Sequence, residues 1–325
     1  MKHSVIRSLA ALVTAATFSA AAFAQDGGPT RIVVPFAAGG PIDVTARVLA
    51  DLVQEDLGTV IIENRPGAGG NIGSSMVAKA NPDGKTLGVA TLASHAVNPW
   101  LYKNMPFDAE KDFEPVSLMV YIPNVLVMNA QQAQELNINS VQDLIGYAKT
   151  NPGILNYGSG GNGSGGHLAG ELFRGQAQVD VVHVPYNGGA PAQLALLSGD
   201  VHFTFDNLAT AAPNIRSGKL KALAVTTDER SNELPDVPTM KESGMKDFSV
   251  STWWGLVVPA GTPAETVEKL NAAFVKAMKN PKAQERFKAL LVEAKPSTPE
   301  EFGKLMSEER ARYKDIVAAA GAQVD

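Results

Sequence analysis

Short apolar runs alternate with amphipathic segments along most of the chain. Residues 31–35 read RIVVP, which is typical of a buried strand. In the segment that follows, Val44, Val48 and Leu52 recur at the spacing of one helix face. The same alternation predicts further strands at 60–62, 86–90, 116–128, 154–157, 179–185, 201–205, 220–226 and 253–258, and further helices at 74–80, 140–150, 166–174, 191–197 and 207–217. This order of elements indicates an α/β fold with mostly parallel sheets.

The C-terminal part of the chain differs, because the pattern after residue 258 predicts helices only. Residues 262–265 read TPAE, which is the sequence of a capping box with proline at the first helical position. Residues 298–301 read TPEE and repeat the arrangement, and the pair NP at 280–281 is typical of another helix start. We therefore expect a helical C-terminal tail.

The first 24 residues have the organisation of a secretory signal peptide. Lys2 and Arg7 give a positive start, residues 8–22 are apolar or small, and residues 22–24 read AFA, a small-residue cleavage pattern. We expect the mature chain to begin near Gln25, in the periplasm. A membrane anchor is the alternative, but it would need a more strongly apolar run of about 20 residues.

Two segments at equivalent places in the strand–helix order resemble each other. Residues 34–41 read VPFAAGGP and residues 184–191 read VPYNGGAP, and each follows a predicted strand and precedes a predicted helix. One interpretation is convergent turn chemistry, because both are β–turn–α junctions. The other is two similar lobes that present the carboxyl ends of their strands to each other. Ligands bind at that edge in open α/β sheets, so two such edges would form a cleft.

Composition narrows the classes of function. Of the 325 residues 45% are hydrophobic and 19% are charged, which is the range of ordinary globular proteins. This length suggests about two domains. Asp and Glu (33) outnumber Lys and Arg (28), so no basic surface for nucleic acid is indicated. The chain has no cysteine, which excludes disulfides, cysteine-ligated metal sites and cysteine nucleophiles.

The motifs of catalysis and metal binding are incomplete. GKT at 84–86 lacks the earlier glycine of a phosphate-binding loop, and residues 67–73 lack the third glycine of a dinucleotide motif. Ser164, His167 and Asp206 are the candidate triad of an exported hydrolase, although Ser164 is outside the usual nucleophile frame. The histidines of the mature chain have no metal-binding spacing. We expect no cofactor and no metal, and keep the hydrolase as the alternative function.

Two glycine-rich loops are suited to anion binding. Residues 159–166 contain only Gly, Ser and Asn, and they precede a predicted helix. The first turn of a helix leaves N–H groups unpaired and carries a partial positive charge, so it can hold a carboxylate or a phosphate. The turn at residues 36–43 offers the same geometry in the other lobe. The alternative is that the glycines only permit tight turns.

Six segments spread over the mature chain have residues that are specific in combination. They are VPFAAGGPID at 34–43, ENRPGAGGNIG at 63–73, DG at 83–84, the loop and helix start at 158–168, VPY at 184–186 and LPDVPT at 234–239. Together they resemble the substrate-binding receptors of tripartite tricarboxylate transporters, also called Bug receptors. The resemblance implies a two-lobed periplasmic binding protein of the Venus flytrap, type II-like kind. Lobe 1 would comprise residues 25–120 and 253–325 and lobe 2 residues 121–252, joined by two hinge crossings.

The resemblance also implies a function and a set of binding residues. A receptor of this family captures a small organic acid between its lobes and delivers it to a membrane permease; it is not an enzyme. By resemblance the ligand-binding residues are Phe36, Ala37, Gly39 and Asp43 in the first loop, Ser159, Asn162, Gly163 and Ser164 in the second loop, and Thr91, Ser94 and Asp206 along the cleft. The receptor is expected to be a monomer that binds no nucleic acid. A sensor protein as a further partner stays open.

Overall fold

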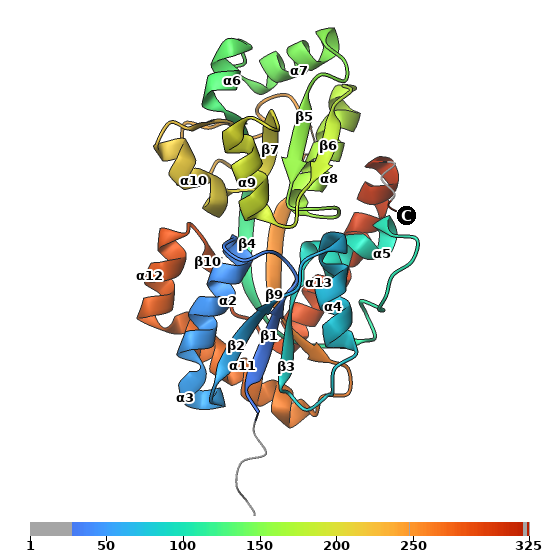
Figure 1. Ribbon diagram of the computed structural model, residues 1–325, viewed down its shortest axis with the longest axis vertical. Coiled ribbons are helices and arrows are strands. Elements are labelled where there is room, and N and C mark those ends of the chain that lie inside the picture. Colours follow the sequence, from blue (N-terminus) through green and yellow to red (C-terminus); the bar gives the residue numbers. More distant parts are fainter. Residues whose placement is uncertain (1–27, 247, 321–323, 325) are drawn as a thin grey trace, which may run out of the picture.

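The computed structural model has two lobes stacked along its longest axis (Figure 1). The structure describes residues 28–246, 248–320 and 324. The predicted signal peptide, residues 1–24, lies outside the described residues. Among the helices of the described part of the chain, none is long and apolar enough to cross a membrane.

The lower lobe in Figure 1 begins with three parallel strands. β1 (Thr30–Val34) lies between β2 (Val60–Asn64) and β3 (Thr86–Thr91). The segments that connect them and follow them are α2 (Pro41–Leu52), α3 (Gln54–Leu57), η1 (Ala68–Gly70), α4 (Asn71–Ala78), the single π-helical segment η2 (Leu92–Val97) and α5 (Asn98–Leu101). Each predicted strand of this region is confirmed, and α2 begins with the proline that sequence analysis assigned to the preceding turn.

The upper lobe repeats this plan. β5 (Asn156–Ser159) lies between β6 (Val182–Pro185) and β7 (Phe203–Asn207), and the pairs are parallel. β8 (Leu220–Val225) follows in sequence. The helices of this lobe are α6 (Ala130–Glu135), α7 (Val141–Thr150), α8 (Gly165–Ala177), α9 (Gly189–Ser198) and α10 (Leu208–Arg216). The two similar segments of the sequence, residues 34–41 and 184–191 (the echo segments), follow strands in different places, because β1 is the central strand of its three and β6 is an edge strand.

Two long strands connect the lobes. β4 (Phe113–Asn129) pairs with β9 (Ser251–Pro259) as far as Pro123, and from Asn124 onward it pairs with β7 and β8. The change of partner follows Pro123 directly, and proline has no N–H to donate to a ladder. All pairs of β4 and β9 are antiparallel, so the sheets are mixed. The predicted parallel pairing holds within the set β1, β2 and β3 and within the set β5, β6 and β7. β4 and β9 run in opposite directions because one leaves the lower lobe and the other returns to it, and β8 and β10 pair with β4 in the antiparallel sense.

The C-terminal tail covers the lower lobe with α11 (Ala264–Lys279), α12 (Pro281–Ala289) and α13 (Pro299–Ala320). The start of α12 is capped by Asn280, and the predicted capping box at the start of α13 is confirmed by reciprocal bonds between residues 298 and 301.

Two expectations for the tail are wrong. The predicted box at residues 262–265 does not form, because Thr262 Oγ1 donates to the Pro259 carbonyl at the end of β9 and Pro263 is the N-cap of α11. The tail is also not only helical, since β10 (Glu293–Ala294) pairs with β4.

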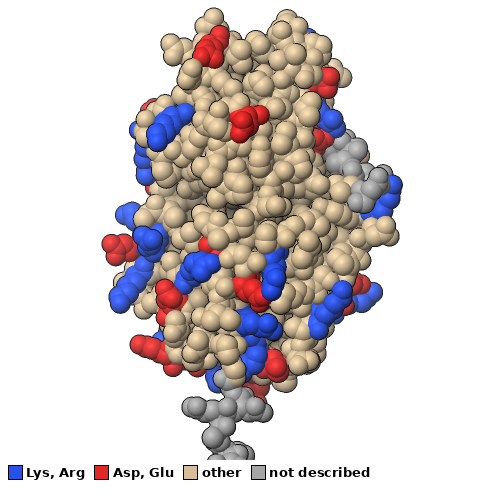
Figure 2. Space-filling view, in the orientation of Figure 1, with Lys and Arg blue, Asp and Glu red and all other residues tan. Residues whose placement is uncertain are grey.

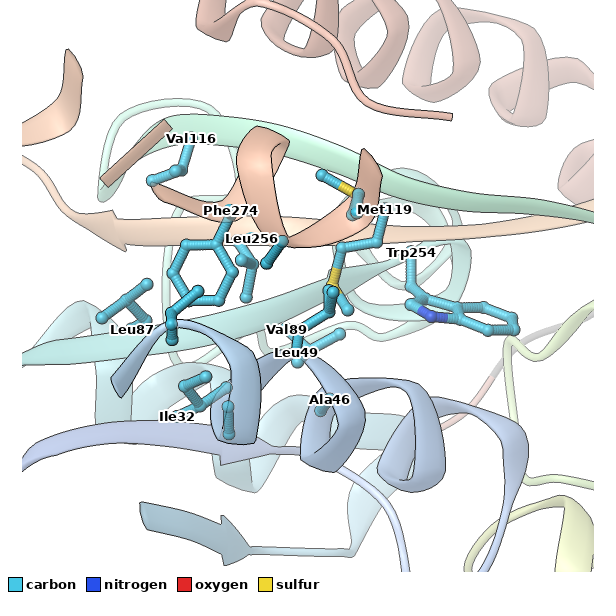
Figure 3. Packing of buried hydrophobic residues seen from close by; sticks show 14 of the residues in the cluster. Ile32, Ala46, Leu49, Leu87, Val89, Val116, Met119, Trp254, Leu256 and Phe274 are labelled. Atoms are coloured by element: carbon cyan, nitrogen blue, oxygen red, sulfur yellow. The ribbon is translucent and has the colours of Figure 1, made fainter. Parts of the chain in front are cut away.

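Buried apolar side chains fill the space between the sheets and the helices. In the lower lobe Phe274 of α11 packs among Leu87, Val116 and Leu256, which come from three different strands (Figure 3). The upper lobe has its own cluster, which includes Phe173 of α8.

Two adjacent tryptophans on β9 pack into two different hydrophobic clusters. Trp254 lies in the cluster of Phe274 and its indole N–H donates to Thr45, whereas Trp253 lies in a cluster below α13 and its indole N–H donates to Glu309. Successive side chains of a strand point to opposite faces, so the two indoles pack into different clusters. Both indoles are fully buried.

Replacing Phe274 by alanine should lower the free energy of unfolding by about 3–5 kcal/mol, because loss of a fully buried ring leaves a cavity. The control is Glu268→Ala on the exposed face of the same helix, which should change it by less than about 0.5 kcal/mol. Urea unfolding of both variants measures the difference. Equal losses for the two variants would contradict this packing.

Candidate functional site

A cavity lies between the lobes where the starts of five helical segments meet. It has about 60 Å³ of space for the centres of water-sized molecules, which is enough for several ordered waters. The segments are α2, η2, α8, α9 and α10, which contribute lining residues 40–43, 91–93, 164–166, 188–189 and 205–207. Three of the starts, at α2, α9 and α10, have no side chain that caps them. Their first-turn N–H groups therefore remain available to a bound anion.

The positive potential of this cavity comes from the backbone. Of the described residues that line it, none is Lys, Arg or His. Each helix start carries the equivalent of about half a positive charge, and the effect is strongest within the first turn. On the face of the molecule that Figure 2 shows, Lys and Arg side chains lie mostly over the lower lobe. The site is thus suited to an anion without presenting a formal cation to it.

The first loop, residues 36–43, is held in place by Asp43. One carboxylate oxygen of Asp43 accepts the Gly39 N–H at 2.9 Å, and the other accepts the Asn64 side chain at 2.9 Å. Arg47 also pairs with the Asp43 carboxylate at 2.9 Å. Burial favours a raised pKa for Asp43, but the bonds from Arg47, Gly39 and Asn64 outweigh it and hold that pKa below its ordinary value. Asp43 is therefore ionised, and its oxygens are committed to the protein.

The second loop brings the start of α8 close to the connecting strands. Ser164 is the N-cap, and its hydroxyl accepts the His167 N–H. A Cβ atom on Gly165 would lie 2.3 Å from Thr252 Oγ1, and one on Gly166 would lie 2.6 Å from the Phe205 carbonyl oxygen. Only residues without a side chain allow the helix start to approach this closely. The glycines therefore do more than permit a turn.

Two histidines support the second loop from below. His167 Nδ1 accepts the Gly163 N–H at 3.1 Å, and His183 Nε2 lies 2.7 Å from Ser159 Oγ. The two rings stack, with 4.2 Å between their centroids. Burial lowers the pKa of His167 to about 4 and that of His183 to about 3, with nearby Arg174 contributing to both. Both rings are therefore neutral at pH 7.

The floor of the cavity is a polar pair from the connecting strands. Asn124 follows the partner change of β4, and its Oδ1 accepts the Thr252 hydroxyl at 2.9 Å. Its Nδ2 donates to the Phe205 carbonyl at 3.2 Å. Both side chains line the cavity, and sequence analysis missed both. The available indication was an Asn directly after Pro123 in an otherwise apolar run.

Asp206 is the second carboxyl group of the cavity lining, and its surroundings differ from those of Asp43. It accepts the Asn207 N–H at 2.8 Å and a longer bond from Gln193 at 3.4 Å. Burial raises the pKa of Asp206 to about 7, against the smaller opposite effects of these two bonds. Near neutral pH the group is therefore divided between its protonated and ionised forms.

The hydrolase alternative does not match this geometry. The His167 ring is bonded to the backbone of residue 163, and the Ser164 hydroxyl is bonded to the backbone of residue 167. Within the described residues, no hydrogen bond joins the ring of His167 to the Ser164 hydroxyl or to Asp206. A triad needs both of these bonds, so Ser164, His167 and Asp206 do not form one.

The cavity brings together only part of the predicted binding residues. Those that line it are Phe36, Ala37, Asp43, Thr91, Ser164 and Asp206. Those that do not line it are Gly39, Ser94, Ser159, Asn162 and Gly163. Ser94 bonds to Thr91 and His95, and the Asn162 side chain bonds to the Tyr102 hydroxyl of the lower lobe. These residues shape the walls rather than face the cavity.

The first loop also contacts the turn after β6 across the cavity. The Ala37 N–H donates to the Asn187 carbonyl at 2.9 Å, which joins the turn after β1 to the turn after β6. A Cβ on Gly40 would lie 3.8 Å from the backbone N of Ala190. The two echo segments of the sequence are therefore opposite walls of one site.

Comparison with known proteins identifies the family. Residues 45–322 match the family model described as "Tripartite tricarboxylate transporter family receptor". The structure is similar to "R. palustris Rpa4515 with adipate", at 35% identity and a TM-score of 0.85, over 91% of this chain and 98% of that chain. It is similar to MatC from Rhodopseudomonas palustris with bound malate, at 34% identity and a TM-score of 0.84, over 89% and 98% of the two chains. The periplasmic binding protein BugD is also similar, at 37% identity and a TM-score of 0.85, over 91% and 98%.

These comparisons confirm the resemblance that the sequence motifs indicated. The family and the similar structures are solute-binding receptors, and nothing in them supports the hydrolase alternative. Because the family model covers most of the described residues and the similar structures cover almost the whole chain, the protein belongs to the family of tripartite tricarboxylate transporter receptors.

Proposed function

We propose that this protein is a periplasmic receptor that binds a small carboxylate in the cavity between its lobes. The observation that carries the proposal is the convergence of five helical starts from both lobes on one cavity whose described lining has no basic side chain. Helix starts bind anions through N–H groups and a partial positive charge. The adipate and malate in two similar structures support a carboxylate as the anion.

The residues that face the cavity are proposed to contact the ligand. They are Phe36, Ala37, Asp43, Thr91, Ser164 and Asp206, joined by Asn124 and Thr252 on the floor. The other predicted residues, Gly39, Ser94, Ser159, Asn162 and Gly163, are proposed to hold the two loops in shape through their bonds within the protein. This division follows from which residues line the cavity.

Ligand binding is proposed to hold the lobes together. We assign residues 25–120 and 253–325 to one lobe and residues 121–252 to the other, with the hinge at the two crossings. The partner change after Pro123 and its pairing with Ser251 support this division. A ligand favours the closed form only if it contacts both lobes, and the cavity has walls from both.

The receptor is proposed to act as a monomer outside the cytoplasmic membrane and to deliver the acid to a membrane permease without chemical change. The family description supports the transport role. Residues 1–24 would direct export and be removed.

A thermal-shift screen tests the proposed function. Small mono-, di- and tricarboxylates, adipate and malate among them, are added to the purified protein, and their uncharged amides serve as controls. At 100 times its dissociation constant a bound acid adds about 2.7 kcal/mol of stability. The amide of that acid should add none. A panel in which every acid leaves the melting temperature unchanged, or one in which an acid is consumed, would contradict the proposal.

Gly165→Ala should weaken acid binding about tenfold or more, which corresponds to about 1.4 kcal/mol. The added carbon would lie 2.3 Å from Thr252 Oγ1, so the start of α8 must move away from the cavity floor. Gly175→Ala in the same helix is the matched control, because nothing lies within 4 Å of its added carbon. The control should keep its affinity and gain about 0.5–1 kcal/mol of stability. Calorimetry of the two variants decides, and equal affinities would count against the α8 start.

Mass spectrometry of the periplasmic protein should give a mature chain that begins at Gln25. Ala24→Leu should block cleavage, since the processing site requires small residues. A full-length periplasmic chain from the unchanged sequence would refute the cleavage, and absence of the protein from the periplasm would refute the export.

A further inference from the structure

The charge balance of the cavity is unusual for an anion site. Its described lining contains two carboxyl groups and no basic side chain. Arg47 pairs with Asp43, so that carboxylate is neutralised locally. Within the described residues Asp206 has no such partner, since it accepts its bonds from a backbone N–H and an amide side chain. A second negative charge brought by a ligand would therefore meet Asp206 with nothing to balance it.

Asp206 lies where the two lobes meet. A carbon added to Gly189, at the start of α9, would be 3.9 Å from Asp206 Oδ1 and 4.0 Å from Pro41 Cδ at the start of α2. The same point is 3.7 Å from Thr210 Oγ1, a buried hydroxyl that has no hydrogen-bond partner among the described residues. Asp206 itself is only 7% exposed. A ligand group here is enclosed by both lobes and by polar atoms that can still form bonds.

The other titratable groups around Asp206 do not balance its charge. On the elements packed against β7, and on α2 across the cavity, they are Tyr157 on β5, His167, Glu171 and Arg174 on α8, Arg216 at the end of α10, and Asp43 and Arg47 on α2. Arg174 pairs with Glu171 and Arg216 pairs with Glu233. His167 is neutral at pH 7.

We propose that Asp206 is protonated when the cavity holds a dicarboxylate, and that its hydroxyl donates a hydrogen bond to one carboxylate of the ligand. This inference rests on the proposed function and concerns the part that Asp206 plays in holding such an acid. The proton comes from solvent and stays on the pair, since two adjacent carboxylates cannot both be ionised without a large repulsion. An O–H···O⁻ bond of this kind is short and strong. Binding is therefore accompanied by proton uptake to the extent that Asp206 is ionised in the free protein, with one proton per ligand as the upper limit.

The direction in which ligand affinity changes with pH follows from the ionisation of Asp206 in the ligand-free protein. Burial places the pKa of free Asp206 at about 7, so the competent protonated form is depleted as pH rises above 7. Apparent affinity scales with the competent fraction. It should fall about twentyfold between pH 6.5 and pH 8.5, and proton uptake should rise from about 0.1 per ligand at pH 6 to about 0.9 at pH 8.

Titration calorimetry with adipate and malate, each in two buffers of different ionisation enthalpy, measures proton uptake directly on the unchanged protein. Asp206→Asn should bind with no proton uptake and with an affinity that no longer changes between pH 6.5 and 8.5, because an amide can donate but cannot ionise. Asp51→Asn, on the exposed side of α2, is the control and should behave like the unchanged protein.

A measurement without ligand keeps the test independent of binding. The melting temperature of Asp206→Asn relative to the unchanged protein should be higher at pH 8.5 than at pH 5. In the unchanged protein the cost of burying the Asp206 carboxyl grows as pH rises from its ordinary pKa of 3.8 to its folded pKa of about 7, and an amide does not carry that cost.

The outcomes separate the two proposals. Dicarboxylate binding without proton uptake, or proton uptake that persists in Asp206→Asn, would overturn the role of Asp206 and leave the receptor function standing. If no acid of the screen binds at any pH, the proposed function fails and this inference fails with it.

Discussion

N–H groups at the start of a helix have no partner within that helix, and in this protein five such starts surround one cavity. The whole arrangement depends on bringing them together. Glycine at the start of α8 allows it to approach the strands, and the pairing of β4 with β9 sets the distance between the lobes. An anion site made of backbone N–H groups depends on where those groups point and not on the net charge of the protein. A chain with a net negative charge can therefore bind an acid.

Asp43 and Asp206 show how surroundings decide what one residue type does. Asp43 accepts bonds from three groups and has Arg47 beside it, so it is ionised and fixes the first loop. Asp206 is equally close to the cavity but lacks a cation, and burial raises its pKa. The sequence places Asp43 after the turn that follows β1 and Asp206 near the end of β7 without showing this difference, because it arises from residues distant along the chain, such as Asn64 and Gln193.

Much of the fold was predictable, since short buried strands and amphipathic helices have distinct periodicities. The family motifs indicated the two loops correctly. Which residues of these loops face the cavity was harder to predict, because the side chains of Ser159 and Asn162 bond to His183 and Tyr102 instead of facing the cavity. Asn124 and Thr252 were missed because strand pairing alone brings residues 128 positions apart into contact. The predicted cap at Thr262 does not form, because its hydroxyl donates to the Pro259 carbonyl at the end of β9.

The connecting strands remain hydrogen-bonded to each other up to the crossing, where Pro123 faces Ser251. A ladder of this kind can bend or twist as a unit, but a slip by one residue would move every side chain to the opposite face and expose Trp253 and Trp254 to the wrong surroundings. The register of β4 and β9 therefore opposes sliding of one lobe past the other. Asn124 and Thr252 line the cavity beside this crossing, whereas Ala37 and Asn187 are joined by a backbone hydrogen bond, so any separation of the lobes that leaves the ladder intact would have to break that bond.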